Sequence, residues 1–298
     1  MRKYYASVRA AGRLTLLAVI TALFLSARTA QLARAEGIDT EHLFAFLIGT
    51  DVGEVGEREF EDQFTGRFAK SSGTYQALAN SAELEFVPVN NLRLGLGMVG
   101  ASYNVQSVSS FGDIQQTGLQ GVSFEGRYKI LDRQTAGFGL TFAMETDVGR
   151  LDEITGQHVR SYGTDFTLAF DRELIADRLV LGVNLLYLPE WTRLVSANIT
   201  EQDATLGVAW SLMAQVQSNL FIGGEARYLR KYEGVALDSF SGQALFVGPT
   251  LHWHLTERSR ITAAWSFQVA GQSATTGGSL DLSNFERRQA RFIYSMDF

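Results

Sequence analysis

The sequence predicts an all-β protein: a single closed antiparallel barrel of about 12 strands that crosses a membrane, with 10 or 14 strands as the nearest alternatives. Three observations predict this fold class. Apolar and polar residues alternate with a period of two along most of the chain. The connections between these stretches alternate between short and long. After the first 35 residues, no stretch has the 18 or more apolar residues of a membrane helix.

Residues 1–35 read as a cleaved secretory signal peptide. The stretch from Leu14 to Leu25 is apolar apart from two threonines, which is short for a membrane span. Ala33-Arg34-Ala35 offers a small-x-small cleavage site, and cleavage after Ala27 or an uncleaved anchor helix are the alternatives. The basic residues before the apolar stretch are Arg2, Lys3, Arg9 and Arg13.

Removal of this peptide makes the mature chain acidic. The peptide holds six of the 26 basic residues and none of the 32 acidic ones, which leaves 20 against 32 and a net charge of −12. A nucleic-acid partner is not expected, because phosphate contacts need clustered lysine and arginine. The chain has no cysteine, which excludes disulfides and thiolate chemistry.

Residues 36–56 form a separate N-terminal segment before the barrel, which occupies residues 57–298. The segment contains an apolar run over 42–48 and an acidic, glycine-rich run over 51–56. We expect a periplasmic segment that either enters the lumen as a small plug or extends the first strand.

The strands are identified by their alternation. Leu92, Leu94, Leu96 and Met98, for example, alternate with an arginine and two glycines. The first strand is the weakest, because Asp62 interrupts its apolar face. The expected strands span residues 57–70, 75–88, 92–105, 119–131, 136–149, 160–172, 178–189, 201–214, 219–231, 242–255, 259–271 and 287–298.

The connections favour a membrane barrel over a soluble sandwich. Short turns are expected on the periplasmic side and longer loops on the extracellular side, over 106–118, 150–159, 190–200, 232–241 and 272–286. In lipid every backbone polar group must be paired within the protein, and only closure removes the sheet edges. An even number of strands then places both ends of the barrel at one rim.

The final strand alternates up to its last residue. Ala290, Phe292, Tyr294, Met296 and Phe298 share one face. This strand resembles the C-terminal signature of Gram-negative outer-membrane β-barrel proteins. The resemblance implies an outer-membrane location among lipid and lipopolysaccharide. It also implies that Phe292, Tyr294 and Phe298 form an assembly signal read by the barrel assembly machinery.

The polar face of the strands is expected to line the lumen, with acids in excess on the first, second, fifth and sixth strands. Basic residues concentrate on the third, fourth, ninth and twelfth. One interpretation is a transverse field across a water-filled pore, and the other is a salt-bridged lumen that fills itself. The lumen-lining candidates are Glu59, Glu83, Arg93, Glu125, Arg127, Glu145, Asp165, Glu225, Arg227, His252 and Arg291.

Catalytic and metal-binding patterns are weak. His252 and His254 share a strand face, but no acidic neighbour is evident, so no metal and no cofactor is expected. His158 and Ser161 give no sharp lipid-hydrolase signature, and an outer-membrane lipid-modifying enzyme is the least favoured reading. The preferred function is passive, porin-like passage of small polar solutes with weak cation preference. The alternative is a structural or surface-interaction barrel that acts through its long loops. The oligomeric state is not indicated.

Overall fold

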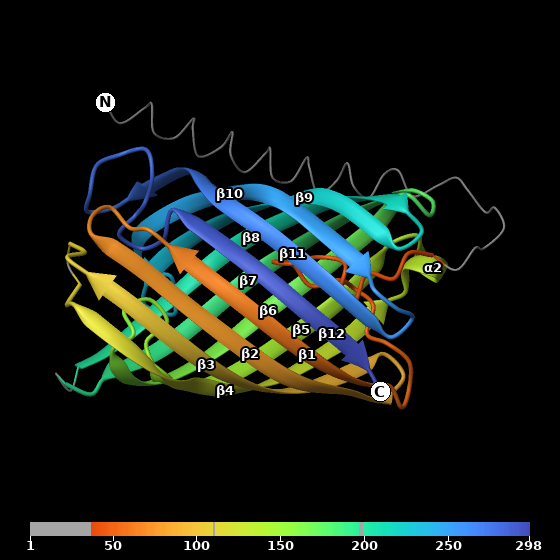
Figure 1. Ribbon diagram of the computed structural model, residues 1–298, viewed down its shortest axis with the longest axis horizontal. Helices are drawn as coiled ribbons and strands as arrows, with labels where there is room; N and C mark the ends of the chain where they lie inside the picture. Colours follow the sequence, from red (N-terminus) through yellow and green to blue (C-terminus); the bar gives the residue numbers. More distant parts are fainter. Residues whose placement is uncertain (1–36, 110, 197–198) are drawn as a thin grey trace. The chain divides into compact units, whose positions relative to one another are not determined.

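The computed structural model describes residues 37–298 except 110, 197 and 198, so the expected signal peptide lies outside the described residues. Residues from Gly37 to Phe298 form one compact unit. Twelve strands make a closed barrel in which each strand is antiparallel to its neighbours in sequence and β1 pairs with β12 (Figure 1). This confirms the predicted fold class and strand number. The strands are β1 Arg58–Phe68, β2 Thr74–Val89, β3 Leu92–Gln106, β4 Ile114–Leu131, β5 Gly139–Leu151, β6 His158–Ile175, β7 Leu179–Leu194, β8 Ile199–Gln217, β9 Leu220–Glu233, β10 Ser239–His254, β11 Ser259–Ser273 and β12 Arg288–Asp297.

The seam between β1 and β12 closes the barrel. Phe64 lies opposite Phe292 in this seam, and the backbone N–H of Phe298 donates to the carbonyl of Arg58 at 3.0 Å. The first strand therefore begins where the last one ends. We call this end of the barrel the terminal rim and the opposite end the loop rim. The pairing leaves no sheet edge, as a membrane requires.

The terminal rim carries tight connections and one short helix, α2 Arg133–Ala136, which Figure 1 shows at the same end of the barrel as the C-terminus. Asp132 caps α2 by accepting from two backbone N–H groups, and Gly137 ends the helix in the left-handed conformation with a φ of 80°. In the part of the chain that the structure describes, no helix is long and apolar enough to cross a membrane.

The loops at the loop rim are shorter than the sequence predicted. β4 already begins at Ile114, β7 runs to Leu194, and β10 begins at Ser239. The predicted loops were too wide because the strands continue past their clearly alternating stretches; in β4 the added residues 115–117 are polar on both faces. Only the last loop, 274–287, keeps the predicted length, and it folds back against the wall: the Asp281 N–H donates to the Gln268 side chain of β11 at 2.6 Å.

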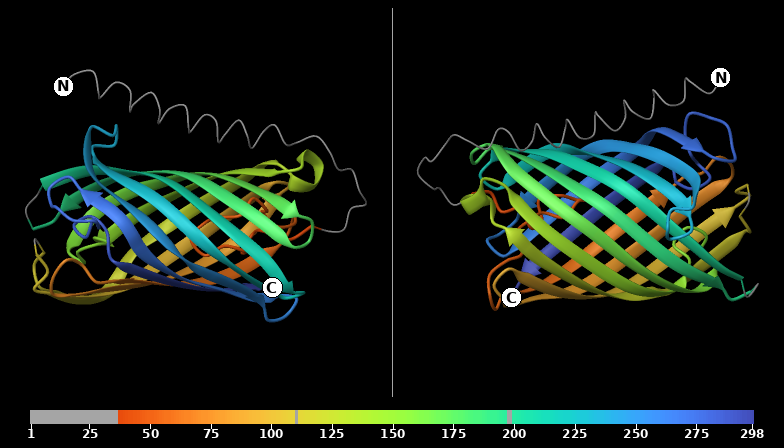
Figure 2. Two further views of the ribbon diagram at one scale, coloured as in Figure 1. Left: turned by 90° about the horizontal axis from the view of Figure 1, so that it is seen from above. Right: turned by 180° about the vertical axis from the view of Figure 1, so that it is seen from behind.

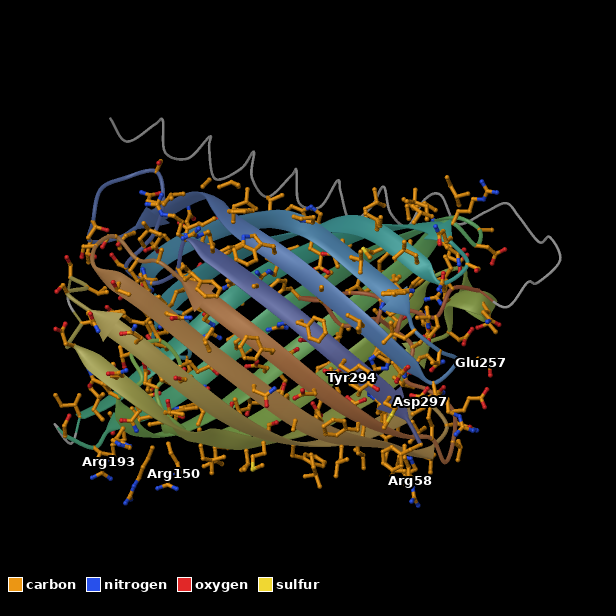
Figure 3. The ribbon with its side chains drawn as sticks, viewed as in Figure 1. Arg58, Arg150, Arg193, Glu257, Tyr294 and Asp297 are labelled. Atoms are coloured by element: carbon orange, nitrogen blue, oxygen red, sulfur yellow. The ribbon has the colours of Figure 1, made fainter. Side chains whose placement is uncertain are left out.

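The outer surface of the barrel is apolar. Large hydrophobic side chains are exposed around the wall, among them Leu84, Leu96, Phe124, Val148, Leu212, Trp265 and Phe292. Charged side chains gather at the two ends, where Figure 3 labels Arg150 and Arg193 at the loop rim and Arg58 and Glu257 at the terminal rim. An apolar belt between charged rims is the surface that a barrel presents to lipid.

Residues 37–57, which we call the lumen segment, run inside the barrel near the terminal rim up to Val52 and then turn at the rim into β1 (Figure 2). Ile38, Leu43, Phe44 and Leu47 of this segment form a buried cluster with lumen-facing residues of three strands, which are Val180, Ala209, Met213 and Phe221. The lumen at this level is therefore filled by the chain's own N-terminal part.

Candidate functional site

The lumen segment is held by hydrogen bonds to strands from all around the barrel. The carboxylate of Glu225 on β9 accepts from the backbone N–H groups of Ala45, at 2.7 Å, and Phe46, at 2.9 Å. On β7, the side chain of Asn184 accepts from the Ile48 N–H at 2.9 Å. These strand side chains satisfy backbone groups that a buried irregular segment would otherwise leave unpaired.

A second anchor joins the lumen segment to α2 and β6 through a buried arginine. Arg133 donates to Asp171 on β6 at 2.7 Å and to Asp51 of the segment at 2.8 Å. Asp171 is fully buried and also accepts from the hydroxyls of Thr40 and Thr50. Burial alone would lower the pKa of Arg133, but the carboxylates of Asp171 and Asp51 raise it above its ordinary value.

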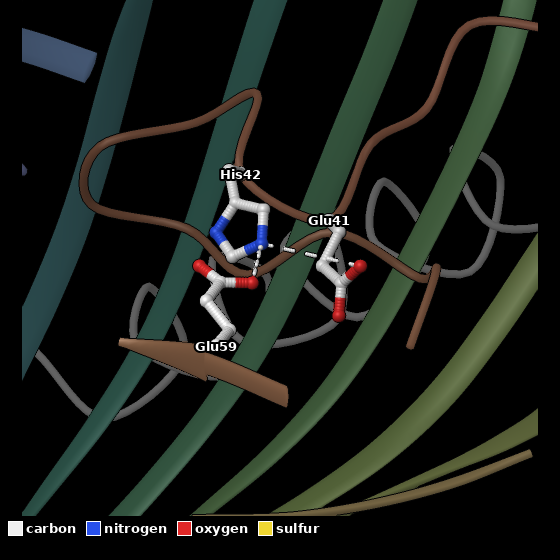
Figure 4. Close-up of side chains that lie close together, drawn as sticks. All are labelled: Glu41, His42 and Glu59. Carbon is white, nitrogen blue, oxygen red and sulfur yellow. Dashed lines mark ion pairs between the residues drawn. The ribbon is translucent and has the colours of Figure 1, made fainter. Parts of the chain in front are cut away.

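A third anchor is centred on His42, which lies beside two carboxylates in Figure 4. Its Nε2 atom lies 2.9 Å from Glu59 of β1 and 3.9 Å from Glu41, and its Nδ1 atom lies 3.4 Å from Glu61. Burial would lower the pKa of His42, but the Glu59 carboxylate outweighs it and raises the pKa to about 10. His42 is therefore a buried cation that ties the segment to β1.

A fourth contact brings two guanidinium groups against one aromatic ring. Arg227 of β9 lies 3.7 Å from the centre of the Phe46 ring, and Arg291 of β12 lies 4.5 Å from it. Arg291 also donates to the Ala45 carbonyl at 3.1 Å. Two positive charges therefore contact the same ring, and Glu225 is the nearby negative charge.

One wall of the lumen is acidic. Glu145 and Asp165 lie directly opposite each other on β5 and β6, and Asp147 and Glu190 lie on the same inner face. None of these four carboxylates makes an ion pair within the described residues, and Asp165 is exposed although it faces inward. Open space therefore remains beside this wall. Basic side chains line other parts of the lumen, with Arg93 and Arg127 on β3 and β4, Arg227 on β9 and Arg291 on β12.

The loop rim is partly covered. Lys70 donates to the Phe285 carbonyl at 2.9 Å and lies 5.3 Å and 5.5 Å from the ring centres of Tyr75 and Phe111. Burial lowers the pKa of Lys70 to about 8. Arg67 of β1 pairs with Glu153, in the loop after β5, at 2.8 Å. These contacts join the loops that border the mouth.

The lumen and the loop rim each contain a cavity. One of about 90 Å³ lies between the lumen segment and the wall, and Gln63, Arg127 and Ile293 border it. The other, of about 350 Å³, is bordered by Ser71, Arg287 and the loop 274–287. The first is large enough for a few water molecules and lies along the lumen.

The structure places all eleven predicted lumen residues on the inner face and brings most of them against the lumen segment or each other. Glu83 and Glu125 converge with a third carboxylate on β2, Glu85. His252 contacts Thr262, and its Nε2 atom lies 3.1 Å from the Nε2 atom of His254. Within the described residues, three groups of side chains could hold a metal ion, and neither of these histidines belongs to any of them. Of the predicted assembly residues, Phe292 and Phe298 are exposed on the outside.

Sequence reasoning missed several of the residues that hold the lumen segment. His42, Arg133, Asp171 and Asn184 have no local motif, since their partners lie tens to hundreds of residues away. Asp171 did offer one signal. It is a charged residue at an inward-facing position near the end of its strand, and the barrel wall alone does not need a charge there.

A closed barrel with an apolar belt and a charged lumen defines an outer-membrane β-barrel of porin-like architecture. The chain belongs to the family of unknown function DUF6662, whose match covers residues 36–298. No curated protein matches it.

Among solved structures, the chain is similar to the COG4313 outer membrane channel from Pseudomonas putida F1, at 11% identity and a TM-score of 0.59, with 84% of this chain and 98% of that chain covered. It also matches the β domain of the Bordetella autotransporter BrkA, at 13% identity and a TM-score of 0.49 over 82% of this chain and 100% of that one. The KdgM porin matches at 11% identity and a TM-score of 0.41, over 80% and 99%. Identities this low concern the fold alone.

Proposed function

We propose that the protein is a porin-like channel of the outer membrane, through which small polar solutes pass passively with weak cation preference. The observation that carries this proposal is the acidic wall of the lumen, where Glu145, Asp147, Asp165 and Glu190 have no ion-pair partner in the described chain. Such carboxylates raise the local concentration of cations in a wet pore and lower that of anions.

The lumen segment sets the size of what passes. It fills the lumen near the terminal rim, which faces the periplasm in this proposal, so the path runs along its surface or opens when it shifts. The COG4313 protein of similar fold is described as an outer membrane channel, which agrees with this assignment.

Conductance in planar bilayers tests the proposal. The purified barrel in asymmetric potassium chloride should give steady steps with a reversal potential that favours potassium. The triple variant Glu145→Gln, Asp165→Asn, Glu190→Gln should reduce that preference, because it removes three unpaired charges from the wall.

The matched control removes the same charge from the rims. Asp113, Asp177 and Glu257 are exposed outside the wall, and the triple variant Asp113→Asn, Asp177→Asn, Glu257→Gln should keep the potassium preference. A correctly folded barrel that stays silent, or equal selectivity in both triple variants, would refute the proposal. A silent barrel would leave the surface-interaction function, for which loop 274–287 is the longest candidate surface.

A further inference from the structure

A second feature of the lumen concerns three carboxylates on the two strands that flank β3. Glu83 and Glu85 of β2 and Glu125 of β4 each place an oxygen within 4.8 Å of the others. Strand β3 runs between them and contributes Gly95, which pairs with Glu85 on one side and Glu125 on the other. Because glycine has no side chain, Gly95 leaves open the space into which the carboxylates converge.

Gly95 forms the floor of this group. A Cβ atom at Gly95 would lie 1.9 Å from Oε1 of Glu83 and 3.5 Å from Cβ of Glu125. Any other residue at this position would therefore displace the Glu83 carboxylate from the group. Gly97, the next inward-facing position of β3, would instead meet the Ser123 hydroxyl, so the two glycines shape different parts of the wall.

Glu85 and Glu125 are buried, Glu83 is half-buried, and the group is incompletely paired. The Glu85 side chain is 1% exposed, and its Oε1 atom has no hydrogen-bond partner among the described residues. Oε1 of Glu83 is also buried without a partner. Leaving such oxygens unsatisfied costs free energy, more for charged groups than for neutral ones.

The local charges do not balance. Arg93 lies 2.8 Å from Glu85 and 2.6 Å from Glu41 of the lumen segment, and Arg127 lies 2.5 Å from Glu125. When all four are ionised, the carboxylates of Glu41, Glu83, Glu85 and Glu125 face two guanidiniums, which leaves a deficit of two positive charges. The adjoining anchor supplies no surplus, because His42 and Arg260 already face Glu59, Glu61 and Asp297.

We propose that Glu83, Glu85 and Glu125 bind a divalent cation of the calcium type over Gly95. Three converging carboxylates with free oxygens provide hard ligands in an irregular arrangement, which calcium accepts more readily than magnesium does. One divalent ion supplies the two missing charges. It also relieves the repulsion around Glu85 and leaves Arg93 to hold Glu41, so the site strengthens the attachment of the lumen segment.

Isothermal titration of the full mature chain, refolded in an uncharged detergent without lipopolysaccharide, tests the site. Calcium chloride should show one saturable site with a dissociation constant at or below about 1 mM, and magnesium chloride should bind at least about tenfold more weakly. Gly95→Ala, which changes no charge, should weaken calcium binding by at least about tenfold, and Glu83→Gln should do the same.

Gly97→Ala on the same strand and Asp165→Asn on the acidic wall should both keep the wild-type calcium affinity. Heat-modifiable migration confirms folding of each variant, and Glu83→Gln carries the test if Gly95→Ala does not fold. Lack of saturable calcium binding in the wild type, or wild-type affinity in folded Glu83→Gln, would overturn the proposal. Neither result depends on whether the barrel conducts.

Discussion

Arg133 offers the clearest test of how the lumen segment is held. It joins Asp51 of the segment to Asp171 of β6, at 2.8 Å and 2.7 Å, and Asp171 is fully buried. Arg133→Met keeps the apolar stem of the side chain and removes the charged guanidinium group. Breaking a buried ion pair by removing one partner costs about 3–5 kcal/mol, because the remaining charge stays buried and uncompensated.

This cost falls on the attached state of the segment, since the barrel wall is held by its own ladders. Every 1.4 kcal/mol is a factor of ten, so the equilibrium between attached and released segment should shift by roughly 100- to 4,000-fold toward release. In planar bilayers, Arg133→Met should show larger or more frequent open steps than the wild type. In liposome swelling it should admit larger sugars.

Lys231→Met is the matched control, because Lys231 pairs with Asp203 at 3.4 Å and that pair makes no contact with the lumen segment. It removes the same charge and should leave the opening frequency unchanged. Unchanged conductance in Arg133→Met, with normal heat-modifiable migration, would refute the view that this arginine holds the segment in place.

Three further predictions concern other contacts. The His42 ion pair should stabilise the attached segment fully below about pH 6.5 and lose that effect as pH rises through about 10. The wild-type conductance should therefore rise with pH above neutrality and that of His42→Gln should not, and an equal dependence of conductance on pH in both proteins would contradict this. Phe285→Ala removes a ring whose centre lies 6.2 Å from that of Phe246, which should lower the stability of the docked loop 274–287 by about 3–5 kcal/mol. Proteolysis within this loop should therefore become faster, and an unchanged cleavage rate would contradict the prediction. Deleting Phe298 removes an exposed side chain and one backbone hydrogen bond, so the free energy of unfolding of the assembled barrel should change by only about 1 kcal/mol. The amount of protein that reaches the membrane should nevertheless fall several-fold, and normal membrane levels would count against an assembly role.

The wall of the barrel could be predicted from the sequence because each strand carries its own two-residue pattern. Leu94, Leu96 and Met98 point to lipid while Gly95 and Gly97 face inward, and no distant information is needed to see it. Even Asp62, which interrupts the pattern in β1, fits the outer face, because the Asn80 side chain of β2 donates to it at 2.7 Å.

The lumen could not be predicted to the same depth. Which acid meets which base depends on the path of the lumen segment, and that path is fixed by contacts such as those of Glu225 with Ala45 and Phe46, which lie 180 and 179 residues away in the sequence. The ends of the strands were also missed. Beyond the lipid both faces are polar, so Gln115 to Thr117 of β4 keep their ladder without any alternation to reveal it.

The position of the lumen segment in the chain has a consequence for biogenesis. The segment precedes β1, yet its partners lie on strands that follow it by up to about 250 residues, including β9, β11 and β12. It is therefore exported before any of the strands that will surround it. Long-range contacts of this kind form late and slowly, because the intervening chain must first be brought together. Either the seam between β1 and β12 closes around the segment, or the segment enters through the terminal rim after closure. In both cases the full set of its ion pairs can form only once the barrel is complete.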